Sequence, residues 1–537
     1  MSDNPVDVLI VGAGPSGAAL AWSLLGSRMR ILCLEQGPML SDAVYPSRKP
    51  DYELSRYAEF SIDPNVRRLP QDYPVNAADS PITPANFNAV GGSTINFSAH
   101  WPRMHPSDFR TRSLDGVGDD WPVDYATLEP YYATNDRITG TSGLAGNPAY
   151  PHYEPPLPPL PLGKLGQTLA RGFNRQGWHW WPSDAAILSR DYDGRAKCVN
   201  AGTCDLGCAT GAKSSANLTY WPVLLRAGVE LRTGCRVREV TLDEHGMASG
   251  VLYHDSEGRL QRQRAELVVL ACNGIGTPRL MLNSTSHRFP DGVANRSGLV
   301  GKNLMFHPLT GISGVFDEPM EGFKGPMGCS IFSHEFYETD PSRDFVRGYG
   351  LQASRWITPM TWALGGVCFD NPVPWGAEHR HLMDEVYPHS AGLTIVTEDL
   401  PRETNSVTLD PELADSDGIP APKITYRVDD NTRRMIAHGE ARAEEALLAA
   451  GATKVMGAGG EVWWRAGWHQ MGTARMGNDP ERSVVNGWGR CHDVHNLFIV
   501  DGSIFVTAGA VNPTSTIQAL ALYIGDSILK NIGSLFD

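Results

Sequence analysis

The stretch VDVLIVGAGPSGAALAWSLL (residues 6–25) decides the fold. Residues 6–11 form an apolar run that is typical of a strand buried on both faces. Glycines follow, and residues 18–25 then have the composition of a helix. A second apolar run, residues 31–34, ends at Glu35. The order strand, tight turn, helix, strand predicts one βαβ unit.

The glycines of this unit form a recognisable phosphate-binding pattern. Gly12, Gly14 and Gly17 give G-x-G-x-x-G directly between strand and helix. Such glycines allow a tight turn, a close approach of the backbone to a diphosphate, and close packing of helix on strand, with the diphosphate at the helix N-terminus. Glu35 stands where a carboxylate accepts hydrogen bonds from a ribose. The alternative is a glycine-rich turn without a nucleotide. The pattern predicts a dinucleotide site and does not distinguish FAD from NAD.

Length, charge and cysteine content exclude several classes of protein. A chain of 537 residues suits two domains. The net charge of −14, with scattered Lys and Arg, disfavours nucleic acid as a partner. No apolar stretch approaches the ~20 residues that span a bilayer. Nine cysteines without a visible signal peptide lead us to expect a reduced, cytoplasmic protein, although periplasmic export with a partner stays open.

The order of segments predicts an α/β chain (α+β overall), a Rossmann-like nucleotide domain interleaved with a sheet-containing substrate domain. Residues 1–309 form the first domain, with inserted loops at about 41–90 and 145–190, which are rich in proline and polar residues. Alternating strand-like segments make residues 310–455 the substrate domain. Residues 456–537 return to the first domain.

Two C-terminal segments carry residues suited to alcohol chemistry, GWHQMGTARMG (467–477) and VDGSIFVTAGAVNPTSTIQALAL (500–522). Oxidising an alcohol requires removal of the hydroxyl proton, and a histidine such as His469 suits that task. The neutral amide of Asn512 can hold the same oxygen without competing for the proton. The alternative is that His469 caps a helix and Asn512 is a turn residue, and residue types alone favour this alternative.

Further blocks add a family resemblance. The segments AVGGSTINFSAHWPR (89–103), ELVVLACNGIGTPRLMLNS (266–284) and GLVGKNLMFHP (298–308) occur, with the βαβ unit and the C-terminal segments, in the order found in glucose–methanol–choline (GMC) oxidoreductases. The resemblance covers nearly all of the nucleotide domain. In the substrate region it is loose, through LPRETNSVTLDP (400–411).

The resemblance implies FAD as cofactor and a catalytic pair at His469 and Asn512, with hydride passing to flavin N5 and His469 as base. It places Asp501 and Gly502 on a strand near the C-terminus where the chain returns to the nucleotide domain and meets the flavin. It places Val237 near the adenine. It implies cofactor contacts at Gly12, Gly14, Gly17, Glu35, Gly91, Gly92, Ser93, Thr94, Asn96, Val237, Asp501, Gly502, Pro513 and Thr514.

The expected substrate is a sugar, glycoside or polyol, and a dehydrogenase is favoured over an oxidase. An aromatic or long-chain aliphatic primary alcohol is the alternative substrate. Two other classes of function compete with this one. A pyridine-nucleotide flavoprotein would need a second G-x-G-x-x-G in mid-chain, and none is evident. A non-catalytic flavin or electron-transfer module would leave His469 and Asn512 unexplained.

Three cysteines, Cys198, Cys204 and Cys208, lie in KCVNAGTCDLGCATGAK (197–213). The segment resembles that of the catalytic subunits of bacterial FAD-dependent glucose and fructose dehydrogenases, which hold a 3Fe-4S cluster. The alternatives are a structural thiol loop or a disulfide between two of the three. Zinc is disfavoured, because no histidine or fourth cysteine lies close by. A cluster would favour electron transfer to a partner subunit or a cytochrome.

The GGSTIN block predicts how the flavin is attached. Gly91 and Gly92 let the backbone approach the flavin ring, and Ser93, Thr94 and Asn96 can hydrogen-bond to it. Some relatives carry a histidine at the position of Asn96 and attach the flavin there covalently. Because an amide has no nucleophilic ring nitrogen, we expect FAD to be bound non-covalently. Acid precipitation should therefore release the yellow colour to the supernatant, and a yellow pellet would contradict this expectation.

Overall fold

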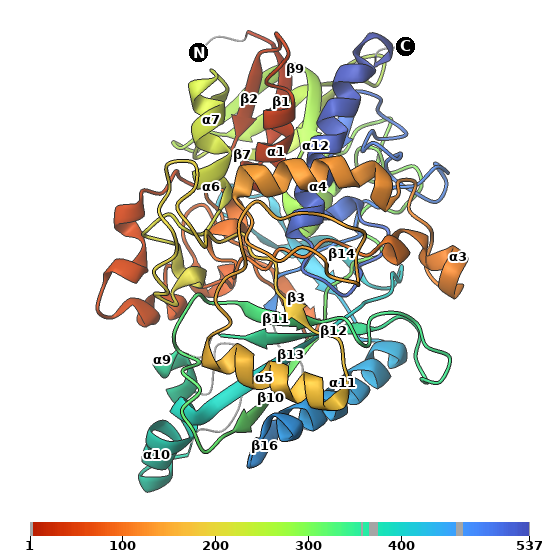
Figure 1. The fold of residues 1–537 in the computed structure, drawn as a ribbon. Helices are drawn as coiled ribbons and strands as arrows, with labels where there is room; N and C mark the ends of the chain where they lie inside the picture. The colour runs from red at the N-terminus through yellow and green to blue at the C-terminus, as the bar shows by residue number, and fades with distance from the viewer. Residues whose placement is uncertain (1–3, 356–357, 365–373, 458–465, 536–537) are drawn as a thin grey trace.

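Two sheets organise the structure (Figure 1). The computed structural model describes residues 4–355, 358–364, 374–457 and 466–535. The first sheet and its helices gather the two ends of the chain, and the second sheet lies at the opposite end of the molecule beside two long helices. The predicted fold class, an α/β chain in which a Rossmann-like unit is interleaved with a second sheet-containing part, is confirmed.

The first sheet contains the predicted βαβ unit. Its strands follow the order β6-β2-β1-β9-β8-β7, and β18 also pairs with β9. The bounds are β1 (Val6–Val11), β2 (Ile31–Leu34), β6 (Glu230–Arg232), β7 (Arg236–Leu242), β8 (Ala248–His254), β9 (Leu260–Leu270) and β18 (Leu497–Ile499). The pairs that involve β1, β2, β6 and β18 are parallel. Parallel strands of this kind are buried on both faces, which explains the continuous apolar runs of the sequence.

Helices complete this layer. α1 (Pro15–Ser23) packs against α12 (Thr514–Lys530), which in turn contacts α4 (Tyr125–Thr139). The helices α1 and α12 approach so closely that a Cβ at Gly525 would lie 1.7 Å from Ser23 Oγ. The first and last long helices of the chain therefore cover the nucleotide unit together.

The second sheet is antiparallel, in the order β16-β10-β13-β12-β11-β5. Its strands are β5 (Trp181–Pro182), β10 (Leu309–Val315), β11 (Cys329–Ser333), β12 (Tyr349–Ser354), β13 (Ser390–Thr397) and β16 (Lys454–Gly457). The helices α5 (Gly163–Gln176) and α11 (Asp430–Ala450) lie side by side against it (Figure 1).

One segment lies elsewhere than expected. The stretch 145–190, expected as a loop of the nucleotide domain, supplies α5 and β5 to the second sheet. The physical reason is an apolar stripe on α5 at helical spacing, Leu165, Leu169 and Phe173, which is buried in the core of that sheet. The domain boundaries themselves stay a prediction.

Smaller elements complete the fold. A three-stranded sheet joins β3 (Asn76–Asp79), β14 (Ser406–Ala414) and β15 (Pro420–Thr425), and β4 (Thr83–Pro84) pairs with β17 (Ala466–Gly467). The remaining α-helices are α2 (Pro64–Arg67), α3 (Thr111–Asp115), α6 (Ala216–Thr219), α7 (Trp221–Arg226), α8 (Asn273–Asn283), α9 (Pro359–Ala363) and α10 (Ala377–His381). Short turns include η4 (Gly92–Ile95), η6 (Cys204–Leu206) and η9 (Gly502–Ile504).

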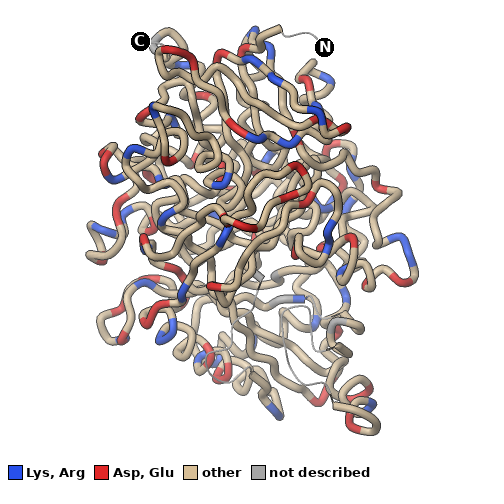
Figure 2. The backbone as a smooth tube through the Cα atoms, turned by 180° about the vertical axis from the view of Figure 1, so that it is seen from behind, with Lys and Arg blue, Asp and Glu red and all other residues tan. Residues whose placement is uncertain are grey.

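Charge is spread over the molecule. Figure 2 shows Lys and Arg interspersed with Asp and Glu along the backbone. Within the described stretches, no helix combines the length and the apolar character needed to cross a bilayer.

A buried lysine ties the cysteine segment to the loop of residues 91–97. Lys213 Nζ lies 3.1, 2.6, 3.0 and 2.6 Å from the carbonyl oxygens of Thr94, Ile95, Phe97 and Cys204. Burial lowers the pKa of Lys213 to about 8, so the ammonium form persists at neutral pH. The ammonium group thus satisfies carbonyl groups of two segments that are distant in sequence.

Replacing this lysine should destabilise the protein. In Lys213→Met the carbonyl acceptors lose their donor, and hydrogen bonds to charged groups contribute about 1.5–3 kcal/mol. We expect a lower midpoint of thermal unfolding at pH 7, measured by calorimetry. The control is Lys197→Met, because Lys197 is exposed in the same segment. Equal midpoints for the two variants would contradict the role of Lys213.

Candidate active site

A single cavity collects the loops of the first sheet and strands of the second. Its walls include Gly12 and Glu35 from the nucleotide unit and Leu309 and Gln352 from the second sheet. In parallel α/β sheets, ligands bind outside the carboxyl ends of the strands, and this cavity lies there. The position agrees with the sequence-based expectation of a nucleotide site beside a substrate site.

The glycine turn has the geometry that its pattern predicts. Gly12 has φ +105°, and a Cβ there would lie 2.5 Å from the carbonyl oxygen of Ala271. A Cβ at Gly17 would lie 2.2 Å from the carbonyl oxygen of Gly12. Gly14 precedes α1, and a Cβ built at Gly14 would have no neighbouring atom within 4 Å. The first and third glycines thus allow backbone segments to pack closely. The second glycine leaves open space at a helix N-terminus, where a diphosphate fits.

Glu35 holds this turn in place. Its Oε2 accepts a hydrogen bond from the backbone N–H of Ala13 and its Oε1 from that of Gly37, both at 2.8 Å. Burial raises the pKa of Glu35 to about 7. Further donors favour a buried carboxylate, so ribose hydroxyls at this position would stabilise its charged form.

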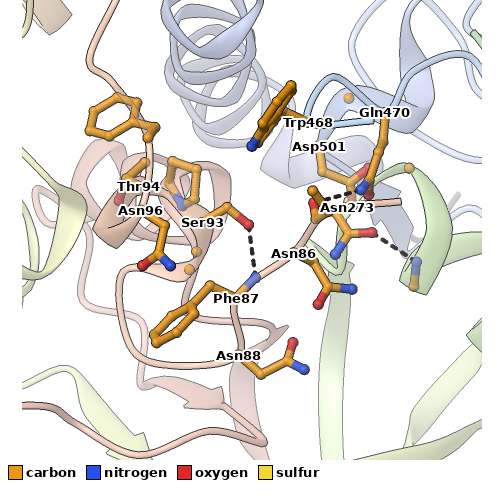
Figure 3. A pocket seen from close by; sticks show the side chains of 18 of the residues that line it. Asn86, Phe87, Asn88, Ser93, Thr94, Asn96, Asn273, Trp468, Gln470 and Asp501 are labelled. Atoms are coloured by element: carbon orange, nitrogen blue, oxygen red, sulfur yellow. Dashed lines mark hydrogen bonds between the residues drawn. The ribbon is translucent and has the colours of Figure 1, made fainter. Parts of the chain in front are cut away.

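The GGSTIN block packs directly on the nucleotide turn. A Cβ at Gly92 would lie 3.0 Å from Gly14 Cα. Thr94 Oγ1 donates to the carbonyl oxygen of Gly91 at 2.5 Å, and Ser93 Oγ accepts from the backbone N–H of Phe87 at 3.1 Å (Figure 3). These contacts fix the loop and leave its cavity-facing surface for a ligand.

Two buried amide atoms on the cavity wall have no partner among the described residues. They are Asn86 Nδ2 and Asn96 Oδ1. Leaving such an atom unpaired costs about 1–3 kcal/mol. In Figure 3, Trp468 and Asp501 of the C-terminal segments lie across the cavity from Asn96. Open space at Gly14 and unpaired amides further along the wall fit FAD, a diphosphate with a polar ring system.

A buried carboxylate holds the C-terminal segment that follows β18 in place. Asp501 follows β18, and its Oδ2 accepts from Thr277 Oγ1 at 2.5 Å. Its Oδ1 accepts from the backbone N–H of Ser503 at 2.9 Å. A Cβ at Gly502 would lie 2.6 Å from the carbonyl oxygen of Gln470. This contact sets the segment before Gln470, which carries His469, against the wall of the cavity.

His469 stands in a defined hydrogen-bonded chain. Its Nδ1 lies 2.8 Å from His307 Nδ1, and His307 Nε2 lies 2.8 Å from the carbonyl oxygen of Gly509. Burial lowers the pKa of His307 to about 4, so this ring is neutral at pH 7. A carbonyl only accepts, so His307 carries its hydrogen on Nε2 and accepts at Nδ1. His469 therefore donates from Nδ1 and keeps a lone pair on Nε2.

Asn512 faces this lone pair. Gln352 Nε2 donates to Asn512 Oδ1 at 2.7 Å, and this contact turns the Asn512 amide nitrogen toward His469. Asn512 Nδ2 lies 3.3 Å from His469 Nε2. Burial lowers the pKa of His469 well below its usual range, and the imidazoles of His307 and His100 lower it further. The site thus presents a neutral imidazole acceptor beside an amide donor.

The structure brings most of the predicted residues to one cavity. The residues on its wall are Gly12, Gly14, Glu35, Gly92, Ser93, Thr94, Asn96, Val237, His469, Asp501, Gly502, Asn512, Pro513 and Thr514. Gly17 and Gly91 do not line it and act through packing.

The three thiols lie apart from this wall. Cys198, Cys204 and Cys208 are free, and none of them lines the cavity. Across the described residues, no group of three or more His, Cys, Asp or Glu side chains is arranged to hold a metal ion. The structure therefore gives the predicted cluster no support. Cys235 and Cys272 line the cavity instead.

Three residues of the site were not singled out from the sequence, namely His307, Gln352 and His100. The two histidines stand in the blocks GLVGKNLMFHP and AVGGSTINFSAHWPR, and a titratable ring in such a block is a usable signal. Gln352 lies on β12, in the region of weakest resemblance, where no local pattern marks it.

Comparison with known proteins identifies the family. Profiles described as GMC oxidoreductase match residues 163–309 and 401–521, and one described as an NAD(P)-binding Rossmann-like domain matches residues 10–73. A 2-methyl-1,2-propanediol dehydrogenase of Mycolicibacterium austroafricanum is 42% identical, covering 100% of this chain and 97% of its own. The fructose dehydrogenase large subunit of Gluconobacter japonicus is 29% identical, covering 98% of each chain.

The fold agrees with a solved structure of low sequence identity. Pyridoxine 4-oxidase from Mesorbium loti superposes with a TM-score of 0.70 at 17% identity, over 98% of this chain and 99% of that one. Fold, cavity and sequence similarity lead to the same assignment. The chain belongs to the GMC oxidoreductases, a family of FAD-dependent alcohol oxidoreductases.

Proposed function

We propose that this protein oxidises a hydroxyl group of a small polyhydroxy compound, a sugar, glycoside or polyol, with His469 as the base. The observation that carries the proposal is the lone pair of His469 Nε2, held beside the amide nitrogen of Asn512 in the cavity that also contains the nucleotide turn. Bound FAD supplies the hydride acceptor.

His469 and Asn512 have different roles at the substrate hydroxyl group. His469 Nε2 accepts the hydroxyl proton, and Asn512 Nδ2 donates a hydrogen bond to the same oxygen, so negative charge on that oxygen is stabilised. The proton then resides on His469. Its Nδ1–H still donates to His307 Nδ1, which stabilises the imidazolium form while the ring orientation is kept.

The cavity lining supports a substrate that is partly polar. Near the second sheet it contains apolar Leu309 and Val396 together with polar Gln352 and Thr394. The two relatives compared above are named for a diol and for a sugar. A polyhydroxy substrate agrees with both observations.

We propose that the protein acts as a dehydrogenase and not as an oxidase. Both relatives are named as dehydrogenases, and one is a large subunit. We therefore propose an electron acceptor other than oxygen, such as a partner subunit or a cytochrome. The cysteine segment does not enter this proposal, because its thiols do not form a metal ligand set in the described structure.

The test is anaerobic reduction of the bound flavin by a panel of sugars, glycosides, polyols, aryl alcohols and long-chain alcohols. We expect polyhydroxy compounds to bleach the flavin fastest, and His469→Ala to slow bleaching by about 10²-fold or more, the scale of general-base catalysis. His492→Ala is the control, because His492 bonds Ser483 and does not line the cavity. Bleaching of His469→Ala at the wild-type rate would remove His469 from the reaction.

The dependence on pH follows from the buried imidazole. Because its pKa lies well below 6.5, His469 is neutral and competent as a base throughout neutral and mildly alkaline pH. We expect the rate constant of flavin reduction at saturating substrate to be flat above pH 6.5 and to fall through one ionisation at lower pH. Stopped-flow absorbance across this range measures it. A rate that continues to rise above pH 8 would contradict His469 as the titrating base.

A further inference from the structure

A second histidine lies on the wall of the cavity that contains His469. The imidazole of His100 is buried, and its Nδ1 has no hydrogen-bond partner among the described residues. A buried imidazole nitrogen without a partner is costly, by about 1–3 kcal/mol. The groups that serve flavin binding and catalysis in the sections above do not account for this ring.

The position of His100 does not depend on its own side chain. Its backbone bridges to Ala185, the backbone N–H of Trp101 donates to the carbonyl oxygen of Asp184 at 3.0 Å, and that of Ala186 donates to the carbonyl oxygen of Ala99 at 2.9 Å. Neighbouring residues therefore fix this segment on both sides of the ring. The fold needs an ordered backbone here but does not need an imidazole.

A glycine lies close beside the ring. A Cβ at Gly328 would lie 2.8 Å from the carbonyl oxygen of Ser98 and 3.6 Å from His100 Nε2, and Gly328 also lines the cavity. Gly328 has φ +104°, a conformation that side chains other than glycine rarely adopt. The Nε2 edge of the ring therefore lies beside a glycine of the cavity wall, where a larger residue would collide with the carbonyl oxygen of Ser98.

Charge limits what this ring can bind. Burial lowers the pKa of His100 to about 4, so the ring is neutral at pH 7. A neutral imidazole offers one N–H donor and one acceptor. A hydroxyl group matches it, since it also donates and accepts, whereas a carboxylate or an ammonium group would be left with its charge uncompensated. The imidazole of His100 also lowers the pKa of His469.

We propose that His100 binds a second hydroxyl group of the substrate, so that the site selects a compound with hydroxyls on neighbouring carbons over a monoalcohol of equal length. This inference rests on the proposed function, since it places the reacting hydroxyl at His469 and Asn512. The hydroxyl that reacts and the hydroxyl that is held would then bind to different walls of one cavity.

The test compares 1,2-propanediol with 1-propanol, which differ only in the second hydroxyl. We expect wild-type flavin to be reduced faster by the diol. In His100→Phe the second-order rate constant for the diol should fall by about tenfold to a hundredfold, while that for 1-propanol stays unchanged. His100→Gln, which keeps a donor and an acceptor, should restore most of the preference for the diol.

Controls separate binding from damage to the site. The ratio of flavin to protein absorbance should equal that of wild type in both variants, and His245→Phe, at a side chain 79% exposed in the turn between β7 and β8, should change neither rate constant. Equal losses for the diol and the monoalcohol would overturn the proposal and assign His100 to the flavin. Absence of any preference for the diol in wild type would overturn it as well.

Failure of the proposed function has a different signature. If neither alcohol bleaches the wild-type flavin, the proposed reaction is wrong for these compounds, and calorimetric titration of the holoenzyme with 1,2-propanediol then measures binding alone. Weaker binding to His100→Phe than to wild type would still support the hydroxyl contact. Equal binding, or no binding to either protein, would overturn it.

Discussion

The last residues of β9 pair with β1 on one side and with β18 on the other, and the rest of the site depends on this double pairing. Val268 contacts Leu9 and Leu497 in register, and Leu270 contacts Val11 and Ile499. Because these pairs are parallel, their carboxyl ends meet at one edge of the sheet. The glycine turn near the N-terminus and the segments of His469 and Asn512 near the C-terminus are thereby brought to one cavity.

Desolvation governs the chemistry at that edge. Burial lowers the pKa values of His307 and His469 and raises that of Glu35. The site therefore contains neutral imidazoles and a carboxyl group whose pKa is about 7. The carbonyl oxygen of Gly509 then determines the tautomer of His307, which determines that of His469. Gln352 orients Asn512 in the same way. His469 and Asn512 are each positioned by a residue behind them.

The cysteine segment shows the limit of a local pattern. Three thiols close together in sequence are compatible with a ligand set, a structural thiol loop or a disulfide, and a ligand set requires convergence in space, which the described residues do not show. Lys213 of this segment has a clear structural role, because its ammonium group bonds carbonyl oxygens of the GGSTIN loop. A charged donor surrounded by backbone acceptors has no sequence signature, because its partners are main-chain atoms.

The sequence by itself determined the βαβ unit, the need for glycine at Gly12 and Gly17, and, through family resemblance, the pair His469 and Asn512. These features can be recognised from the sequence because they depend on steric contacts within a few residues or on short motifs that are read without knowing their surroundings. Only the tertiary structure decided that α5 and β5 join the second sheet, that His307 bonds His469, and that His100 shares the cavity with His469. Contacts between residues so far apart depend on packing of whole elements, which no local spacing encodes.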